Sequence, residues 1–184
     1  MIDYKVVPCP SLGHTEEEEE DNEQQELLLS GIKRVVALPK LLDVKFVCED
    51  VRKVRANRTL LASGSEYFLE LFYGDMKASC ADMTIPLPSV KADSLQVVVD
   101  YLHGRPFRWN KDSSWDILVD TYLLADEYQV KGLCKRVLRL VPTLRYPGEL
   151  GDLLNAAVPR QATAILEAAL KVTVASNDVT VNSG

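Results

Sequence analysis

The chain has 184 residues, of which 47% are hydrophobic and 26% are charged. This length suits one domain with a short extension, and the hydrophobic fraction is large enough for a core. The formal net charge is −6, and no basic stripe could neutralise phosphates, which argues against nucleic acid as a direct partner. No apolar stretch approaches the roughly 20 residues needed to span a membrane. The N-terminus lacks a signal-peptide pattern, so we expect a soluble protein of the cytoplasm, the nucleus or both.

Residues that carry chemistry are scattered. The four cysteines have no C-x-x-C spacing, which predicts free thiols rather than disulfides or metal ligands. Neither His14 nor His103 belongs to a G-x-S-x-G or H-E-x-x-H motif. We therefore expect no catalytic, cofactor-binding or metal-binding residues and no enzyme activity; a small enzyme that uses His103 is the remote alternative.

Residues 1–22 have the composition of a disordered tail. Pro8, Pro10 and Gly13 interrupt it, and residues 16–21 form an unbroken acidic run. Neighbouring carboxylates repel one another, so the run resists folding. We predict that it solvates the chain, and docking to a basic partner is the sharper alternative.

A first helix is predicted over residues 23–37, where apolar residues recur at helical spacing. Pro39 ends it. Such a stripe has to be buried, against its own domain or against another chain. The stripe consists of Leu28, Leu29, Ile32, Val35 and Val36.

Three short strands follow. Residues 44–48 and 53–56 flank a turn at residues 49–50, which indicates a hairpin. Residues 84–87 contain Pro86, and because proline lacks the ladder N–H donor, this strand should lie at a sheet edge or end there.

Helices dominate the remainder. Ser65 is a suitable N-cap for a helix that reaches Phe72, and Ser113 with Asp116 fits a capping box. Further helices are predicted over residues 92–103, from residue 113 onward, and over residues 130–140, 149–157 and 160–175.

This order predicts an α+β domain in which a small mixed sheet is capped by a cluster of helices. We place the domain at residues 23–141, after the acidic tail of residues 1–22. A short helical extension is expected at residues 142–175 and a polar tail at residues 176–184.

The stretch from Leu42 to Phe72 resembles the BTB/POZ domain family. It reads LDVKF and then VRANRTLLASGSEYFLELF, where family members have D-V-x-F and F-x-A-H-[KR]-x-[VL]-L-[AS]-x-x-S-x-[YV]-F. TIPL at residues 84–87, LQVVVDYLHG from Leu95 and LLADEYQVKGLC from Leu123 are similar to later family segments. The resemblance covers about residues 24–140 and implies a protein-interaction fold whose first helix packs across a two-fold symmetric dimer.

The resemblance also implies contact surfaces. The stripe from Leu28 to Val36 is the candidate dimer interface, and packing onto its own domain is the alternative. A loop at residues 105–110 carries Phe107 and Trp109, which either anchor a partner or pack beneath the loop. A docking face like that of cullin-binding members, with core and loop positions as the alternative, would contain Phe72, Tyr73, Met76, Tyr122 and Tyr128.

Two positions depart from the family pattern. Asn57 replaces the usual histidine, so any pH-linked role there is lost. Ala78 replaces the glutamate that follows the apolar position, here Met76, in many cullin-binding members.

We therefore expect a homodimeric adaptor or scaffold that binds an unidentified client, with a cullin-type ubiquitin ligase as one possible partner. The alternative is an oligomerisation or transcription-regulatory scaffold that binds no cullin. Residues 142–175 are long enough to form only the start of a BACK-like extension.

Overall fold

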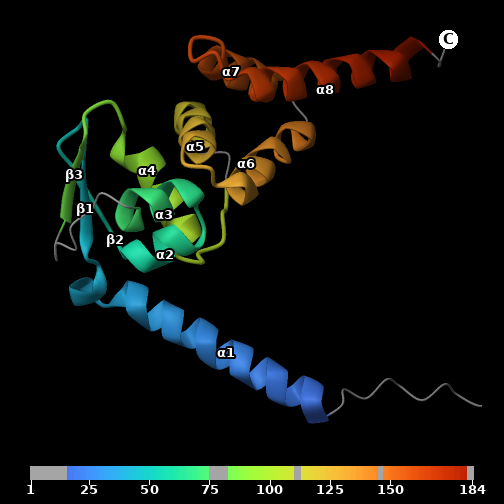
Figure 1. The fold of residues 1–184 in the computed structure, drawn as a ribbon. Coiled ribbons are helices and arrows are strands. Elements are labelled where there is room, and N and C mark those ends of the chain that lie inside the picture. The colour runs from blue at the N-terminus through green and yellow to red at the C-terminus, as the bar shows by residue number, and fades with distance from the viewer. Residues whose placement is uncertain (1–15, 75–82, 110–112, 145–146, 182–184) are drawn as a thin grey trace, which may run out of the picture.

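The chain folds into a small sheet with helices gathered along one side of it (Figure 1). This computed structural model describes residues 16–74, 83–109, 113–144 and 147–181. The architecture is the α+β class that the order of elements predicts. The elements are α1 (Glu16–Ala37), the 3-10 turn η1 (Pro39–Leu41), β1 (Val44–Cys48), β2 (Lys53–Ala56), α2 (Arg58–Ser63), α3 (Glu66–Tyr73), β3 (Met83–Leu87), α4 (Ala92–Leu102), α5 (Trp115–Glu127), α6 (Lys131–Leu138), the 3-10 turn η2 (Val141–Thr143), α7 (Pro147–Ala157) and α8 (Thr163–Val181).

The sheet has three strands in the order β2-β1-β3. β1 and β2 form the predicted antiparallel hairpin, with Phe46 opposite Val54, and β3 pairs with β1 in parallel, with Ile85 opposite Phe46. Because side chains alternate along a strand, every second residue of β1 and β2 is buried. β3 contains Pro86 and lies at an edge of the sheet, which confirms the prediction from its missing N–H.

Ser65 caps α3, as predicted. Its Oγ accepts a hydrogen bond from the Phe68 backbone N–H at 3.1 Å and donates one to the Tyr128 carbonyl at 2.6 Å. One hydroxyl therefore satisfies a free helix N–H and joins α3 to the residue that follows α5. α5 itself begins after Ser114, one position later than the predicted cap at Ser113.

Aromatic rings from β1, α3 and the end of α5 form the centre of the core. The Phe68 ring centroid lies 6.0 Å from that of Phe46, 5.8 Å from that of Phe72 and 5.0 Å from that of Tyr128. Burying a large apolar side chain of this kind stabilises a fold by roughly 1.5–3 kcal/mol. Aliphatic side chains complete the core, among them Leu61, Leu95, Val98, Leu118 and Leu133.

α1 differs from the prediction at its start. The helix begins at Glu16 rather than at residue 23, so the acidic run of residues 16–21 is helical rather than disordered. α1 extends away from the sheet and meets the body of the domain at its C-terminal end, beside η1 (Figure 1).

α7 and α8 lie at the opposite end of the domain from α1 (Figure 1). α7 packs against α5, and α8 packs against η2 and α6. Leu153, Ala157 and Ile165 are fully buried there, so the extension shares the core of the domain. α8 continues to Val181, and the polar tail expected from residue 176 is therefore helical up to that point.

Candidate protein-interaction surface

Exposed apolar residues gather on α1. Leu27, Leu28 and Leu29 expose 72%, 66% and 56% of their surface, and Leu38 and Leu41 continue the exposed apolar surface beyond the helix. Packing onto the same domain, the alternative considered for the stripe, therefore does not occur at Leu28 and Leu29. Contiguous apolar surface of this kind marks an interaction site. The remaining stripe positions, which are half-buried, are Ile32, Val35 and Val36.

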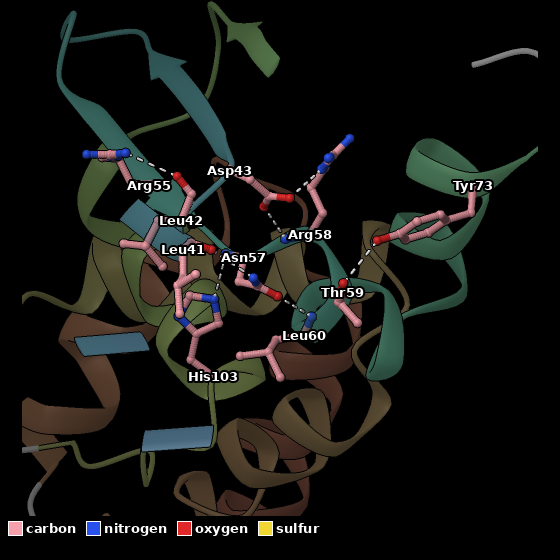
Figure 2. Close-up of polar contacts among 10 residues, drawn as sticks. All are labelled: Leu41, Leu42, Asp43, Arg55, Asn57, Arg58, Thr59, Leu60, Tyr73 and His103. Carbon is pink, nitrogen blue, oxygen red and sulfur yellow. Dashed lines mark hydrogen bonds and ion pairs between the residues drawn. The ribbon is translucent and has the colours of Figure 1, made fainter. Parts of the chain in front are cut away.

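Hydrogen bonds anchor the root of α1, the segment of residues 38–42 that joins the helix to β1. The Arg55 guanidinium donates to the carbonyls of Pro39 at 3.0 Å and Leu42 at 3.1 Å (Figure 2). Asn57 Nδ2 donates to the Leu41 carbonyl at 2.8 Å. These carbonyls, which a loop would otherwise leave to water, thus bind Arg55 on β2 and Asn57 just after it. The hydrogen bonds fix the root and with it the direction in which α1 leaves the domain.

Asn57 connects this root to α2 and to the end of α4. Its Oδ1 accepts a hydrogen bond from the Leu60 N–H at 3.0 Å and caps α2, while its own N–H donates to His103 Nε2 at 3.2 Å (Figure 2). His103 is buried, and burial lowers its pKa, which suits a neutral ring that accepts. Asn57, which replaces the usual histidine of the family, therefore caps α2, and His103 accepts a hydrogen bond from its backbone N–H.

Asp43 connects the start of β1 to α2. Its two carboxylate oxygens accept from the Arg58 backbone N–H at 2.9 Å and from Arg58 Nε at 2.8 Å (Figure 2). Asp43, the first residue of the D-V-x-F motif, therefore binds a free backbone N–H at the start of α2, as Asn57 does.

Three of the five residues of the predicted docking face lie in the core, where the alternative placed them. Phe72, Tyr122 and Tyr128 are buried in the core, because the helices that carry them face the sheet and one another. Burial raises the pKa of Tyr122 and, more strongly, that of Tyr128. Tyr73 is 55% exposed, and its hydroxyl lies 3.1 Å from Thr59 Oγ1 (Figure 2). The position at Met76 lies outside the described residues.

The loop that begins at residue 105 packs its two aromatic side chains against the core of the domain. Phe107 and Trp109 are half-buried against the core, and the Trp109 ring lies 5.8 Å from that of Trp115. Packing beneath the loop, rather than an exposed anchor, is therefore what these two side chains do. The last loop residue, Asn110, lies outside the described residues.

A family model described as BTB/POZ domain matches residues 34–143. The chain belongs to the BTB/POZ domain family. A BTB/POZ domain is a protein–protein interaction module, which agrees with an exposed apolar helix as the leading candidate surface. The matched segment begins inside α1, so Leu28 and Leu29 lie just before it, and it ends at η2, before α7 and α8.

Several curated relatives share this BTB/POZ segment. BTB/POZ domain-containing protein 9 from Homo sapiens is 33% identical over 87 residues, which are 47% of this chain and 14% of that protein; the Bos taurus protein gives the same figures. Kelch-like protein 21 from Danio rerio is 32% identical over 137 residues, which are 74% of this chain and 22% of that protein. The chain thus spans less than a quarter of the length of these relatives.

Among solved structures, the BTB domain of human gigaxonin is similar to this chain. The match covers 76% of this chain and 99% of that one, at 18% identity and a TM-score of 0.43.

Other site chemistry is sparse in this BTB/POZ domain. Within the described ranges, no group of three histidine, cysteine or acidic residues could hold a metal ion. No described helix is long and apolar enough to cross a membrane. Cys48 and Cys134 are free thiols, and burial raises the pKa of Cys134 to about 11, which makes its thiolate scarce near neutral pH.

No sequence motif indicated the structural role of Arg160. Arg160, between α7 and α8, donates from Nε to Asp120 at 2.6 Å and pairs with Asp116 at 2.7 Å. The only local signal is the i, i+4 spacing of the two aspartates, which places both on one face of α5.

Proposed function

We propose that this BTB/POZ domain forms a homodimer through α1 and acts as a scaffold or adaptor that brings other protein chains together. The observation that carries the proposal is the exposure of Leu28 and Leu29 on a helix that leaves the domain. A two-fold contact suits this stripe because each copy supplies the same patch.

The physical driving force is burial of apolar surface. Each leucine that becomes fully buried contributes roughly 1.5–3 kcal/mol, and two-fold symmetry counts every leucine twice. Leu27, Leu38 and Leu41 extend the surface that a second copy can cover. α1 has 22 residues, and at 1.5 Å per residue it offers a contact roughly 33 Å long.

Light scattering at micromolar concentration tests the dimer. The chain has a mass of 20.5 kDa, and we expect twice that mass. Leu28→Asp should shift the protein to the monomer, because a charge would be buried at the centre of the contact. Leu170→Asp is the matched control, since Leu170 is similarly exposed, at 62%, but lies on α8. A wild-type monomer would contradict the proposal, as would equal effects of the two variants.

A second candidate function is that of a substrate adaptor for a cullin-type ubiquitin ligase. It is supported by the resemblance to cullin-binding members, in which Met76 matches the apolar position. Leu69 and Tyr73 on α3 are exposed immediately before that segment, and α7 and α8 stand where a BACK-like extension would begin. Ala78, in place of glutamate, weakens the case.

A pull-down with the purified N-terminal domain of a cullin tests this second candidate. We expect binding that Tyr73→Ala weakens and Ala78→Glu strengthens, with Val158→Ala, an exposed position on the far extension, as the control. No binding at tens of micromolar would end the adaptor proposal. The function left would then be an oligomerisation or transcription-regulatory scaffold, and we propose the cytoplasm or nucleus as its location.

A further inference from the structure

The charges of α1 are separated along its length. Eight acidic residues lie within residues 16–26, and two cations, Lys33 and Arg34, lie near the other end. The exposed Leu28 and Leu29 lie between the two groups. α1 therefore has an acidic half, an apolar middle and a basic end.

Glu26 and Lys33 have no oppositely charged partner among the residues of one copy that the structure describes. Opposite charges on one helix interact when they are three or four residues apart, but the residues at those distances before Lys33 and Arg34 are leucine, serine and glycine. Within the described ranges, neither Glu26 nor Lys33 makes an ion pair, and both are exposed. Their opposite charges have to come from solvent ions or from a second chain.

Glu26 and Lys33 lie on the same flank of the stripe. They are seven residues apart, close to two turns of a helix with 3.6 residues per turn, and both flank the stripe on the side of Leu29. If two copies of α1 pair antiparallel about a two-fold axis between residues 29 and 30, position 26 of each copy faces position 33 of the other. In a parallel pair, the acidic half of one helix lies beside the acidic half of the other, and the two halves repel each other.

The same antiparallel register brings the acidic run to a basic root. In this register Asp21 of one copy lies toward the root of the other, where Lys40 is exposed. The Arg55 guanidinium lies at this root as well, bound to the carbonyls of Pro39 and Leu42. Charge complementarity therefore continues along the helix and onto the domain.

We propose that a second copy of this chain binds α1 in the antiparallel orientation, with Glu26 and Lys33 forming reciprocal ion pairs that select it. In this register Asp21 and Glu23 of each helix lie toward the basic end and root of the other. This inference rests on the homodimer proposed above and adds its orientation and the ion pairs that select it.

Charge reversal tests the orientation. Dimer dissociation constants are measured by sedimentation at low salt for the wild type, Glu26→Lys, Lys33→Glu and the double variant that carries both changes. Each single variant turns two attractive pairs into two repulsive ones, and we expect a weakening on the order of tenfold. The double variant restores opposite charges across the antiparallel contact and should return to within roughly threefold of the wild type.

The possible outcomes separate this inference from the dimer itself. Lys171→Glu, an exposed charge reversal on α8, is the control and should leave the dissociation constant unchanged. A wild-type monomer overturns both proposals. A stable dimer that neither single variant weakens, or a double variant no tighter than the single ones, overturns the antiparallel pairing and leaves the dimer standing.

Discussion

α1 and the α7–α8 extension are the two helical segments that flank the body of the domain, and they use their apolar residues in opposite ways. Leu28 on α1 is mostly exposed, whereas Leu153 on α7 and Ile165 on α8 are completely buried. The extension thus completes the core of its own domain, while α1 presents its stripe to solvent. A leucine-rich helix beside a domain can serve either purpose, and the surface available to it decides which.

The polar contacts that join the α7–α8 extension and α1 to the domain differ as well. Arg160 joins the extension to α5 through the carboxylates of Asp116 and Asp120. The hydrogen bond to Asp120 raises the pKa of the Arg160 guanidinium above its usual value. At the root of α1, Arg55 and Asn57 instead bind main-chain carbonyls. The extension is thus joined to α5 by ion pairs between side chains, whereas α1 joins the domain through hydrogen bonds to the main chain of its root.

The largest effect is expected in the buried segment. Leu153→Ala should lower the free energy of unfolding by about 2–5 kcal/mol, because it removes fully buried methyl groups and leaves a cavity. Chemical denaturation measures this change, with Leu170→Ala, an exposed position on α8, as the control that should stay within about 0.5 kcal/mol. Equal effects of the two variants would show that the extension is not part of the core.

A smaller effect is expected at the ion-pair anchor. Arg160→Met keeps the aliphatic stem and should cost about 1–3 kcal/mol, since Asp120 loses a charged hydrogen-bond partner and keeps only Lys91. Denaturation of Arg160→Met with and without Asp120→Asn checks the cause. Adding Asp120→Asn should recover part of the loss, and an additive loss would count against the pairing as its source.

The smallest effect concerns the joint at the root of α1 and depends on pH. Burial lowers the pKa of His103 below its usual value of 6.5, with Asp100 raising it and Arg105 lowering it to lesser degrees. Well above pH 6.5 the ring is neutral in both the folded and the unfolded state and adds no pH dependence. As pH falls below 6.5, the unfolded chain takes up a proton that the folded chain resists, so the free energy of unfolding decreases.

Denaturation of the wild type and His103→Gln between about pH 7.5 and pH 5.5 measures this effect, because the usual histidine pKa lies in that range. Glutamine can still accept from the Asn57 N–H but does not titrate, so the variant should lose less stability as pH falls. Identical slopes for the two proteins would mean that His103 is not the group responsible.

Features that depend on neighbouring residues could be predicted from the sequence. The alternation in β1 and β2, the edge position of the strand with Pro86 and the cap at Ser65 follow from local geometry and local hydrogen bonds, and the structure has all three. The order of such signals between Leu42 and Cys134 was also enough to indicate the BTB/POZ family. The predicted start of α1 at residue 23 was wrong, because a helix that has formed extends at little cost and this one continues back to Glu16.

The fate of each apolar face was decided only by the tertiary structure. Periodicity shows that Tyr122 and Leu28 both lie on apolar faces, but it does not show what covers them. Tyr122 is covered because surrounding helices pack over it, and Ser65 with Tyr128 shows how contacts distant in sequence hold such helices together. Leu28 stays exposed because no element of the described chain lies against the middle of α1. The sequence by itself determined that a stripe exists, and only the arrangement of distant elements determined that Leu28 and Leu29 within it remain exposed.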